Sequence, residues 1–216
     1  MKEKDWLACE HPQQMLLTLQ KKENSRKGDR PWRLLACAAA RDVWAKLSQP
    51  CQKAVECAER FADGLANRQE LQAADEKIMQ RGLSCAGFAA ARWAAWAPPR
   101  SHGRTQFQAV KLCLEWSIKL APPGESKRQV ALIHDVFGNP FQSATFETEW
   151  VTPNVVKLAR SAYEKRLLPS GDLDPQRLAA LATALEKSGC SEPAILEHLR
   201  NGKPHVRGCW VLDLVL

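Results

Sequence analysis

The residues of this sequence best suited to chemistry are two cysteines and two histidines close to the C-terminus. One stretch of twenty residues contains Cys190, His198, His205 and Cys209. Thiolate sulfur and imidazole nitrogen are ligands that zinc favours, and two of each can close a tetrahedral site. Their spacing matches none of the usual zinc-binding patterns. The residue types therefore make a zinc site one hypothesis for this stretch, and the spacing counts against it.

The separation of Cys190 and His198 limits how many of these side chains can share one ion. Cys190 comes just before a predicted helix, and His198 lies near the end of that helix. Because a helix rises about 1.5 Å per residue, the two residues are expected to lie about 12 Å apart. This distance argues against a four-ligand site. It leaves open a three-ligand site formed by His198, His205 and Cys209.

The same stretch has two other interpretations. A histidine beside a cysteine can produce a nucleophilic thiolate, and His205 with Cys209 is the pair that fits such an enzyme. The sequence shows no third group that would orient the histidine, so we assign no catalytic residue. In the favoured, purely structural interpretation, His205 and Arg207 bond to backbone carbonyl groups. Cys209 and Trp210 then pack in the core and lock the C-terminal tail.

A concentration of positive charge near the N-terminus is the second candidate site. The formal net charge of the chain is +7, which permits an acidic partner such as nucleic acid. The local excess consists of Lys21, Lys22, Arg26, Lys27, Arg30 and Arg33. Such side chains can neutralise a phosphate backbone, but no recognised nucleic-acid motif accompanies them. Nucleic-acid binding is therefore an alternative, and a solvated loop is the more common role of such a run.

The sequence lacks the standard catalytic and redox motifs. It contains no Gly-x-Gly-x-x-Gly, no phosphate-binding Gly-Lys-Ser/Thr, no Gly-x-Ser-x-Gly, no His-Glu-x-x-His and no Cys-x-x-Cys. Eight tryptophans are many for 216 residues, and exposed tryptophan is typical of a partner surface. We therefore expect a non-enzymatic protein-binding or scaffolding module with a protein partner. A nucleic-acid-binding protein and a metal-binding or Cys/His-dependent enzyme are the alternatives.

The elements that must position these residues are predicted to be helices. Apolar residues recur at steps of three and four, and prolines stand where helices begin or end. Thr152-Pro153 and Asp174-Pro175 each combine a capping side chain with a proline in the first turn. We predict an all-α, globular assembly of about ten helices, with residues 141–150 as a candidate extended segment. The apolar tail, residues 209–216, should dock into the core as a helix or a strand.

Tryptophans on the predicted apolar faces should lie in the interior. Those on apolar faces are Trp44, Trp93, Trp116 and Trp210. Trp6 and Trp150 are near the ends of segments, where they could cover helix ends instead. This distinction is a direct test of how well an apolar stripe predicts burial.

Residues 121–126 (APPGES) are the best candidate boundary in the chain. They separate an N-terminal helical part, residues 1–122, from a C-terminal helical part, residues 127–216. The alternative is one continuous domain.

The sequence also predicts where the protein resides. Its N-terminus has no long apolar run behind the charged residues, so it does not look like an export signal. No stretch approaches the roughly 18 uninterrupted apolar residues that would cross a membrane. Together with eight cysteines, these features predict a protein of the reducing cytoplasm without a membrane span.

Several strings in the chain resemble those of a protein family. The most specific are DVFGNPF at residues 135–141 and PHVRGCW at residues 204–210, and further similar segments cover most of the chain except about residues 71–126. Together they resemble a family of uncharacterised bacterial proteins that is numerous in planctomycetes. The resemblance implies a bacterial, intracellular protein and no particular activity. This chain departs from the family pattern at Ala39 and Ala40, where relatives tend to have cysteines, and at His134, where an arginine is usual.

Overall fold

Helices provide the regular secondary structure of this protein. The computed structural model describes residues 1–22, 29–80, 86–95, 106–120, 124–142 and 144–216. These ranges contain twelve α-helices and two short 3₁₀ helices but no strand, so the predicted all-α fold is confirmed. The candidate extended segment, residues 141–150, is a loop in its described part and ends in a 3₁₀ turn at Thr148–Trp150. A single extended segment has no neighbouring strand to satisfy its backbone groups, so no sheet forms there.

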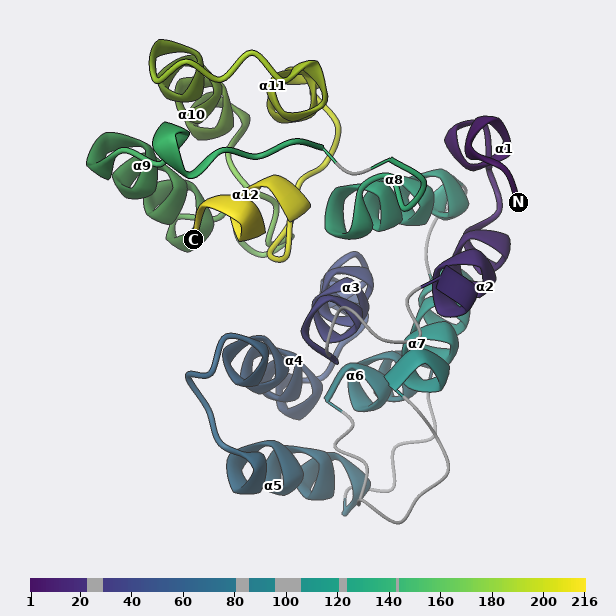
Figure 1. Ribbon diagram of the computed structural model, residues 1–216. Helices are drawn as coiled ribbons and strands as arrows, with labels where there is room; N and C mark the ends of the chain where they lie inside the picture. Colours follow the sequence, from purple (N-terminus) through teal and green to yellow (C-terminus); the bar gives the residue numbers. More distant parts are fainter. Residues whose placement is uncertain (23–28, 81–85, 96–105, 121–123, 143) are drawn as a thin grey trace.

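The first group of helices surrounds α3 (Figure 1). Its members are α1 (Glu3–Leu7), α2 (Pro12–Lys22), α3 (Asp29–Arg41), α4 (Gln49–Ala62), α5 (Arg68–Met79), α6 (Ala86–Ala95), α7 (Gln106–Leu120) and α8 (Glu125–Phe137). Every residue of α3 from Pro31 to Arg41 is buried. Helices α4, α6, α7 and α8 all pack against it. A helix that is covered on all sides forms the centre of the first core.

The second group consists of α9 (Pro153–Glu164), α10 (Pro175–Lys187), α11 (Pro193–Arg200) and α12 (Trp210–Val215). The predicted caps are confirmed, because Thr152 accepts a hydrogen bond from the Val155 N–H and Asp174 accepts one from the Gln176 N–H. The tail docks as the helix α12. Figure 1 shows α12 between α9–α11 on one side and helices α3 and α8 on the other.

The two groups bury separate apolar clusters. The first core contains buried residues from Trp6 to Phe137 together with Val206, and the second contains buried residues from Trp150 to Val215. Helix α8 follows the predicted boundary, yet its buried side chains, such as Ile133, belong to the first core. Residues 121–123 of that boundary lie outside the described residues. In the described part, the apolar clusters change between Phe137 and Trp150.

The burial of the tryptophans is the opposite of what the apolar faces predict. Trp6 and Trp150, near segment ends, are 0% and 7% exposed. The four expected in the interior, Trp44, Trp93, Trp116 and Trp210, are only partly buried against the cores. An indole is too large to be covered by one neighbouring helix, so its burial depends on segments that arrive from elsewhere in the chain.

None of the helices in the described ranges is long and apolar enough to cross a membrane.

Candidate metal centre

Four side chains with metal-binding atoms meet where the two helix groups adjoin. Asp135 comes from α8, His198 from α11, and His205 and Cys209 from the segment that leads into α12. One ligand atom from each of them lies within 4.8 Å of the other three. The set therefore joins residues of both helix groups at one point.

Local structure brings His205 and Cys209 to the same side of their loop. The backbone N–H of Leu173 donates to the His205 carbonyl at 2.7 Å, and that of Cys209 donates to the Val206 carbonyl at 3.0 Å. Gly208 between them has φ +88°, a conformation that glycine adopts without the steric cost of a side chain. The chain can therefore turn tightly after His205 and bring the Cys209 thiol back toward the imidazole.

Four distances define the geometry of the centre. His198 Nε2 lies 3.1 Å from Asp135 Oδ1 and 3.3 Å from Cys209 Sγ. His205 Nδ1 lies 2.6 Å from Asp135 Oδ1 and 4.0 Å from Cys209 Sγ. Ligands bound about 2.0–2.3 Å from a tetrahedral zinc ion are about 3.3–3.8 Å apart. Three of these four separations are within about 0.2 Å of that range, and in the fourth His205 and Asp135 must move apart to admit an ion.

Each imidazole presents a single nitrogen to both the carboxylate and the thiol. His198 uses Nε2 for both contacts, and His205 uses Nδ1 for both. In a nucleophile–histidine–carboxylate relay, the nucleophile and the carboxylate contact opposite nitrogens of the ring. One nitrogen carries at most one hydrogen, so it cannot donate to both neighbours at once. The arrangement is that of ligands around a common centre rather than of a catalytic triad.

Burial and charge suit a divalent cation. Asp135, His205 and Cys209 are 2%, 3% and 0% exposed, and the His198 side chain is 13% exposed. A carboxylate, a thiolate and two neutral imidazoles carry two negative charges, which a divalent cation neutralises. This match matters because an unbalanced buried charge is costly.

The pKa shifts of the metal-free centre have identifiable causes. Burial and then the negative charge of Asp135 raise the pKa of the Cys209 thiol well above its usual value. Burial alone would raise the pKa of Asp135, but hydrogen bonds from His198 and His205 lower it. A cation in the centre would reverse the effect on the thiol, because metal coordination deprotonates a cysteine.

Groups around the ligands restrict their orientation. The Val206 N–H donates to Asp135 Oδ2 at 2.7 Å, which leaves Oδ1 facing both histidines. The Trp210 ring lies 5.1 Å from the His198 ring and also lies close to Gly138, where a Cβ atom would come within 3.3 Å of it. Such outer contacts orient metal ligands and contribute to metal affinity.

The structure brings together three of the four residues proposed from sequence and adds one. His198, His205 and Cys209 converge, as the three-ligand arrangement requires. Cys190 is not among the converging residues, although it is buried in the same apolar cluster as Cys209. It precedes α11, whereas His198 lies near the end of that helix, so the length of the helix separates them. Sequence reasoning missed Asp135. The feature of the sequence that could have pointed to Asp135 is the string DVFGNPF, which begins with this aspartate. It is as specific as the string that contains His205 and Cys209.

The C-terminal tail makes different contacts from those that the structural interpretation predicts. His205 bonds to the Asp135 carboxylate, and Arg207 pairs with Asp63 Oδ2 at 3.4 Å. Neither side chain makes the expected bond to a backbone carbonyl of the described residues. Cys209 is buried as expected, and Trp210 is partly buried.

Some side chains of the basic segment are exposed, and others pair with groups elsewhere in the protein. Lys21 and Lys22 are exposed, and the Lys22 ammonium lies 3.5 Å from the centre of the Phe141 ring. Arg30 pairs with Asp63 and Asp213, and Arg33 is buried and donates to the Ala94 carbonyl at 3.2 Å. Arg26 and Lys27 lie outside the described residues. The structure does not bring the four described members together on one surface.

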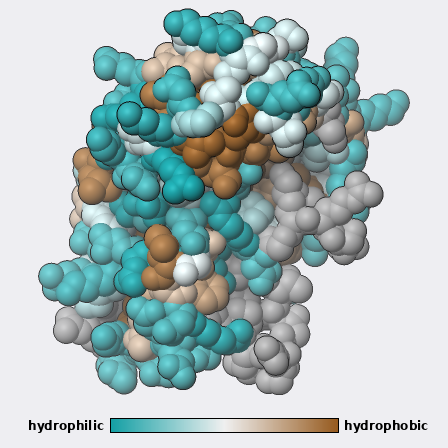
Figure 2. All heavy atoms as spheres, turned by 60° about the vertical axis from the view of Figure 1, so that its left-hand side comes forward, coloured by the Kyte–Doolittle hydropathy of each residue, from teal (hydrophilic) through white to brown (hydrophobic). Residues whose placement is uncertain are grey.

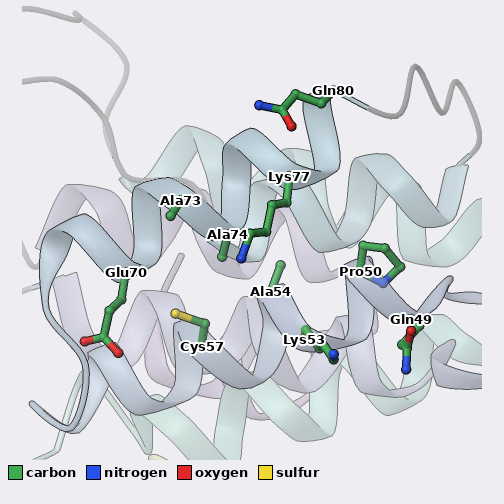
Figure 3. A pocket seen from close by; sticks show the side chains of 10 residues that line it. All are labelled: Gln49, Pro50, Lys53, Ala54, Cys57, Glu70, Ala73, Ala74, Lys77 and Gln80. Carbon is green, nitrogen blue, oxygen red and sulfur yellow. The ribbon is translucent and has the colours of Figure 1, made fainter.

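A groove with a volume of about 620 Å³ lies between α4 and α5. Figure 3 shows short side chains along it, among them Ala54, Ala74 and Cys57. Its lining also includes Lys53, Lys77 and Glu70, so its charge selects neither an anion nor a cation.

Comparison with known proteins adds no relative: no family model, no curated protein and no solved structure matches this chain. The resemblance to the planctomycete family therefore stays a prediction, and the candidate function depends on the chemistry of the centre.

Proposed function

We propose that this protein binds one zinc ion in the centre formed by Asp135, His198, His205 and Cys209, and that the ion is structural. The observation that supports the proposal is the convergence of one thiol, two imidazoles and one carboxylate on a common point. Sulfur and nitrogen ligands in a tetrahedral arrangement favour zinc over magnesium or calcium, which prefer oxygen.

A structural role fits this ligand set better than a catalytic one. Catalytic zinc sites keep one coordination position for water or substrate, whereas structural sites are closed by four protein ligands. Here the protein supplies four ligands, and Cys209 is fully buried. The same burial speaks against a cysteine nucleophile, because a substrate would have no access to the thiol.

The first experiment measures the metal content of the purified chain and of two matched variants. We expect about one zinc per wild-type chain and a loss of most of the metal in Cys209→Ser. Cys190→Ser is the matched control, because Cys190 is buried in the same apolar cluster as Cys209 but is not part of the centre. It should retain the metal. Cobalt(II) gives an independent signal, since thiolate coordination produces an absorption band that should be present in the control and absent in Cys209→Ser.

His198→Ala is a second variant, for the case that Cys209→Ser does not fold. The His198 side chain is the most exposed of the four ligands, so its removal disturbs the packing least. A folded His198→Ala protein should bind zinc at least about tenfold more weakly than the wild type. Wild-type protein that holds no zinc after growth and purification with zinc, and that binds no cobalt, would remove the proposal.

A protein-binding role stays a second prediction from the sequence. Figure 2 shows apolar atoms gathered on the upper part of one face. Exposed large apolar side chains of the C-terminal residues include Leu167, Leu168, Leu214 and Leu216. Exposed apolar groups of this kind are typical of contact surfaces when they are contiguous. A structural zinc ion is compatible with such a role, since it stabilises a fold without taking part in a reaction.

A further inference from the structure

Three arginine-centred networks connect the two helix groups. The first network is buried around Glu59 of α4. Its carboxylate accepts hydrogen bonds from Arg41 of α3 at 2.5 and 2.9 Å, and from Arg166 at 3.0 and 3.1 Å. The side chains of Arg41 and Glu59 are 3% and 4% exposed. Ion pairs this deeply buried are screened only weakly by dissolved salt.

The other two networks lie closer to solvent. Arg30 of α3 pairs with Asp213 of α12 at 2.5 Å, and these side chains are 35% and 32% exposed. The same network includes Asp63, which pairs with Arg30 at 3.0 Å and with Arg207 at 3.4 Å. Arg128 of α8 pairs with Asp42 at 2.5 Å and with Asp172 at 2.8 Å. The side chains of Arg128 and Asp172 are 28% and 25% exposed. Salt is expected to weaken both of these networks, because solvent ions reach them.

The metal centre is a fourth connection between the same two groups. Asp135 belongs to α8 of the first group, whereas His198 and Cys209 belong to the second group. Bonds from one ion to ligands on both sides would restrain their separation directly. Packed units of one chain are expected to move relative to one another unless their interface is large and hydrophobic. A metal ion that bridges them would restrain such motion.

We propose that zinc in this centre acts as a clasp between the two cores, and that its removal leaves an interface that salt can loosen. The inference rests on the proposed zinc site and adds a role for it. Without the ion, the centre is held by hydrogen bonds to Asp135 from His198, from His205 and from the Val206 N–H. The Arg30 and Arg128 networks then provide part of the remaining contact between the two groups, and salt weakens that part.

The test compares amide hydrogen exchange of zinc-loaded and chelator-treated full-length protein at low salt and at about 1 M salt, where the screening length falls to about 3 Å. In zinc-free protein, salt should speed exchange in the peptide covering residues 205–215 by about tenfold or more. In zinc-loaded protein, the same change in salt should alter that rate less than about twofold. Amides inside α10 should respond little in either form, because α10 packs mainly against α9 and α11 of its own group, whereas α12 also contacts α8.

Two aspartate variants separate the clasp from a general effect of charge. Asp135→Asn removes a proposed ligand, and the variant should behave like zinc-free protein whether or not zinc is added. Asp172→Asn removes one partner of Arg128 and leaves the ligands intact. This variant should exchange faster at low salt and still be protected by zinc.

The possible failures are distinguishable because metal content is measured on the same samples. If wild-type protein holds zinc but exchanges at the same rate with and without it at both salt concentrations, the clasp is refuted and the zinc site stands. If wild-type protein holds no more zinc than Asp135→Asn, the zinc site and the clasp are refuted together.

Discussion

At the scale of single residues, a buried ionisable group in this protein is either charged and paired or neutral. Glu59 stays charged: burial alone would raise its pKa, but hydrogen bonds from Arg41 and Arg166 outweigh burial and lower it. Cys113 stays neutral, because burial raises the pKa of its thiol to about 12. Whether a buried group has charged partners therefore decides its state, and the sequence does not reveal those partners.

Glu59 should make stability fall at acidic pH. Its folded-state pKa is lowered below the reference value of 4.5, so its contribution is present above that value and is lost as the pH falls through the lower folded-state pKa. Glu59→Gln should lose about 3–5 kcal/mol of unfolding free energy at neutral pH, because Arg41 is left buried without its partner. Urea unfolding from neutral to acidic pH measures both effects.

Glu56→Gln is the control for this prediction. Glu56 lies on the same helix but is exposed, so its replacement should change the unfolding free energy by no more than about 0.5 kcal/mol. A Glu59→Gln protein as stable as the Glu56→Gln protein at neutral pH would contradict a stabilising role for the buried pair.

At the scale of elements, short-range signals explain the helices that were predicted well. Helices α9 and α10 begin where a capping side chain precedes a proline, since the cap satisfies an otherwise unpaired N–H and the proline has none to satisfy. The loop conformation of residues 141–142 and 144–147 and the short helix α12 are not determined by such signals. Their conformations depend on contacts with other segments.

The Thr152 cap should make a measurable contribution to stability. Its hydroxyl accepts a hydrogen bond from the Val155 N–H at 3.3 Å, so Thr152→Ala should reduce the unfolding free energy by about 1 kcal/mol. Thr183→Ala is the matched control. Thr183 is exposed inside α10 and bonds back to the Ala179 carbonyl, and alanine has the higher helix propensity there. Equal losses in the two variants, measured by urea unfolding, would argue against the cap.

At the scale of the whole molecule, close contacts between the helix groups constrain the connecting segments. Gly171 lies in the segment between α9 and α10 with φ +80°, and a Cβ atom there would collide with the Arg41 side chain. The carboxylate of Glu59 holds that arginine in place. Substitution at Gly171 should therefore disturb the contact between the groups as well as the local backbone.

Gly202 provides a control that separates these two effects. It also has positive φ, +65°, but a Cβ atom there would meet nothing within 4 Å. Gly202→Ala should thus show the backbone cost alone, about 1–2 kcal/mol. Gly171→Ala should lose about 1–3 kcal/mol more, owing to the collision. Thermal and urea unfolding of both variants measure the difference, and equal losses would contradict the proposed tight contact.

The sequence by itself determined the all-α class, the starts of the capped helices and three of the four proposed ligands. These features depend on residue type and on neighbours within one or two helical turns, so they can be read without knowledge of the fold. The tertiary structure alone decided the rest. Asp135 is 63 residues away from His198 and meets it only because α8 lies beside the segment around α11 and α12. Packing likewise placed Cys190 in the second core and directed Arg30 and Arg33 into contacts within the protein, since contacts between distant segments depend on how whole helices pack.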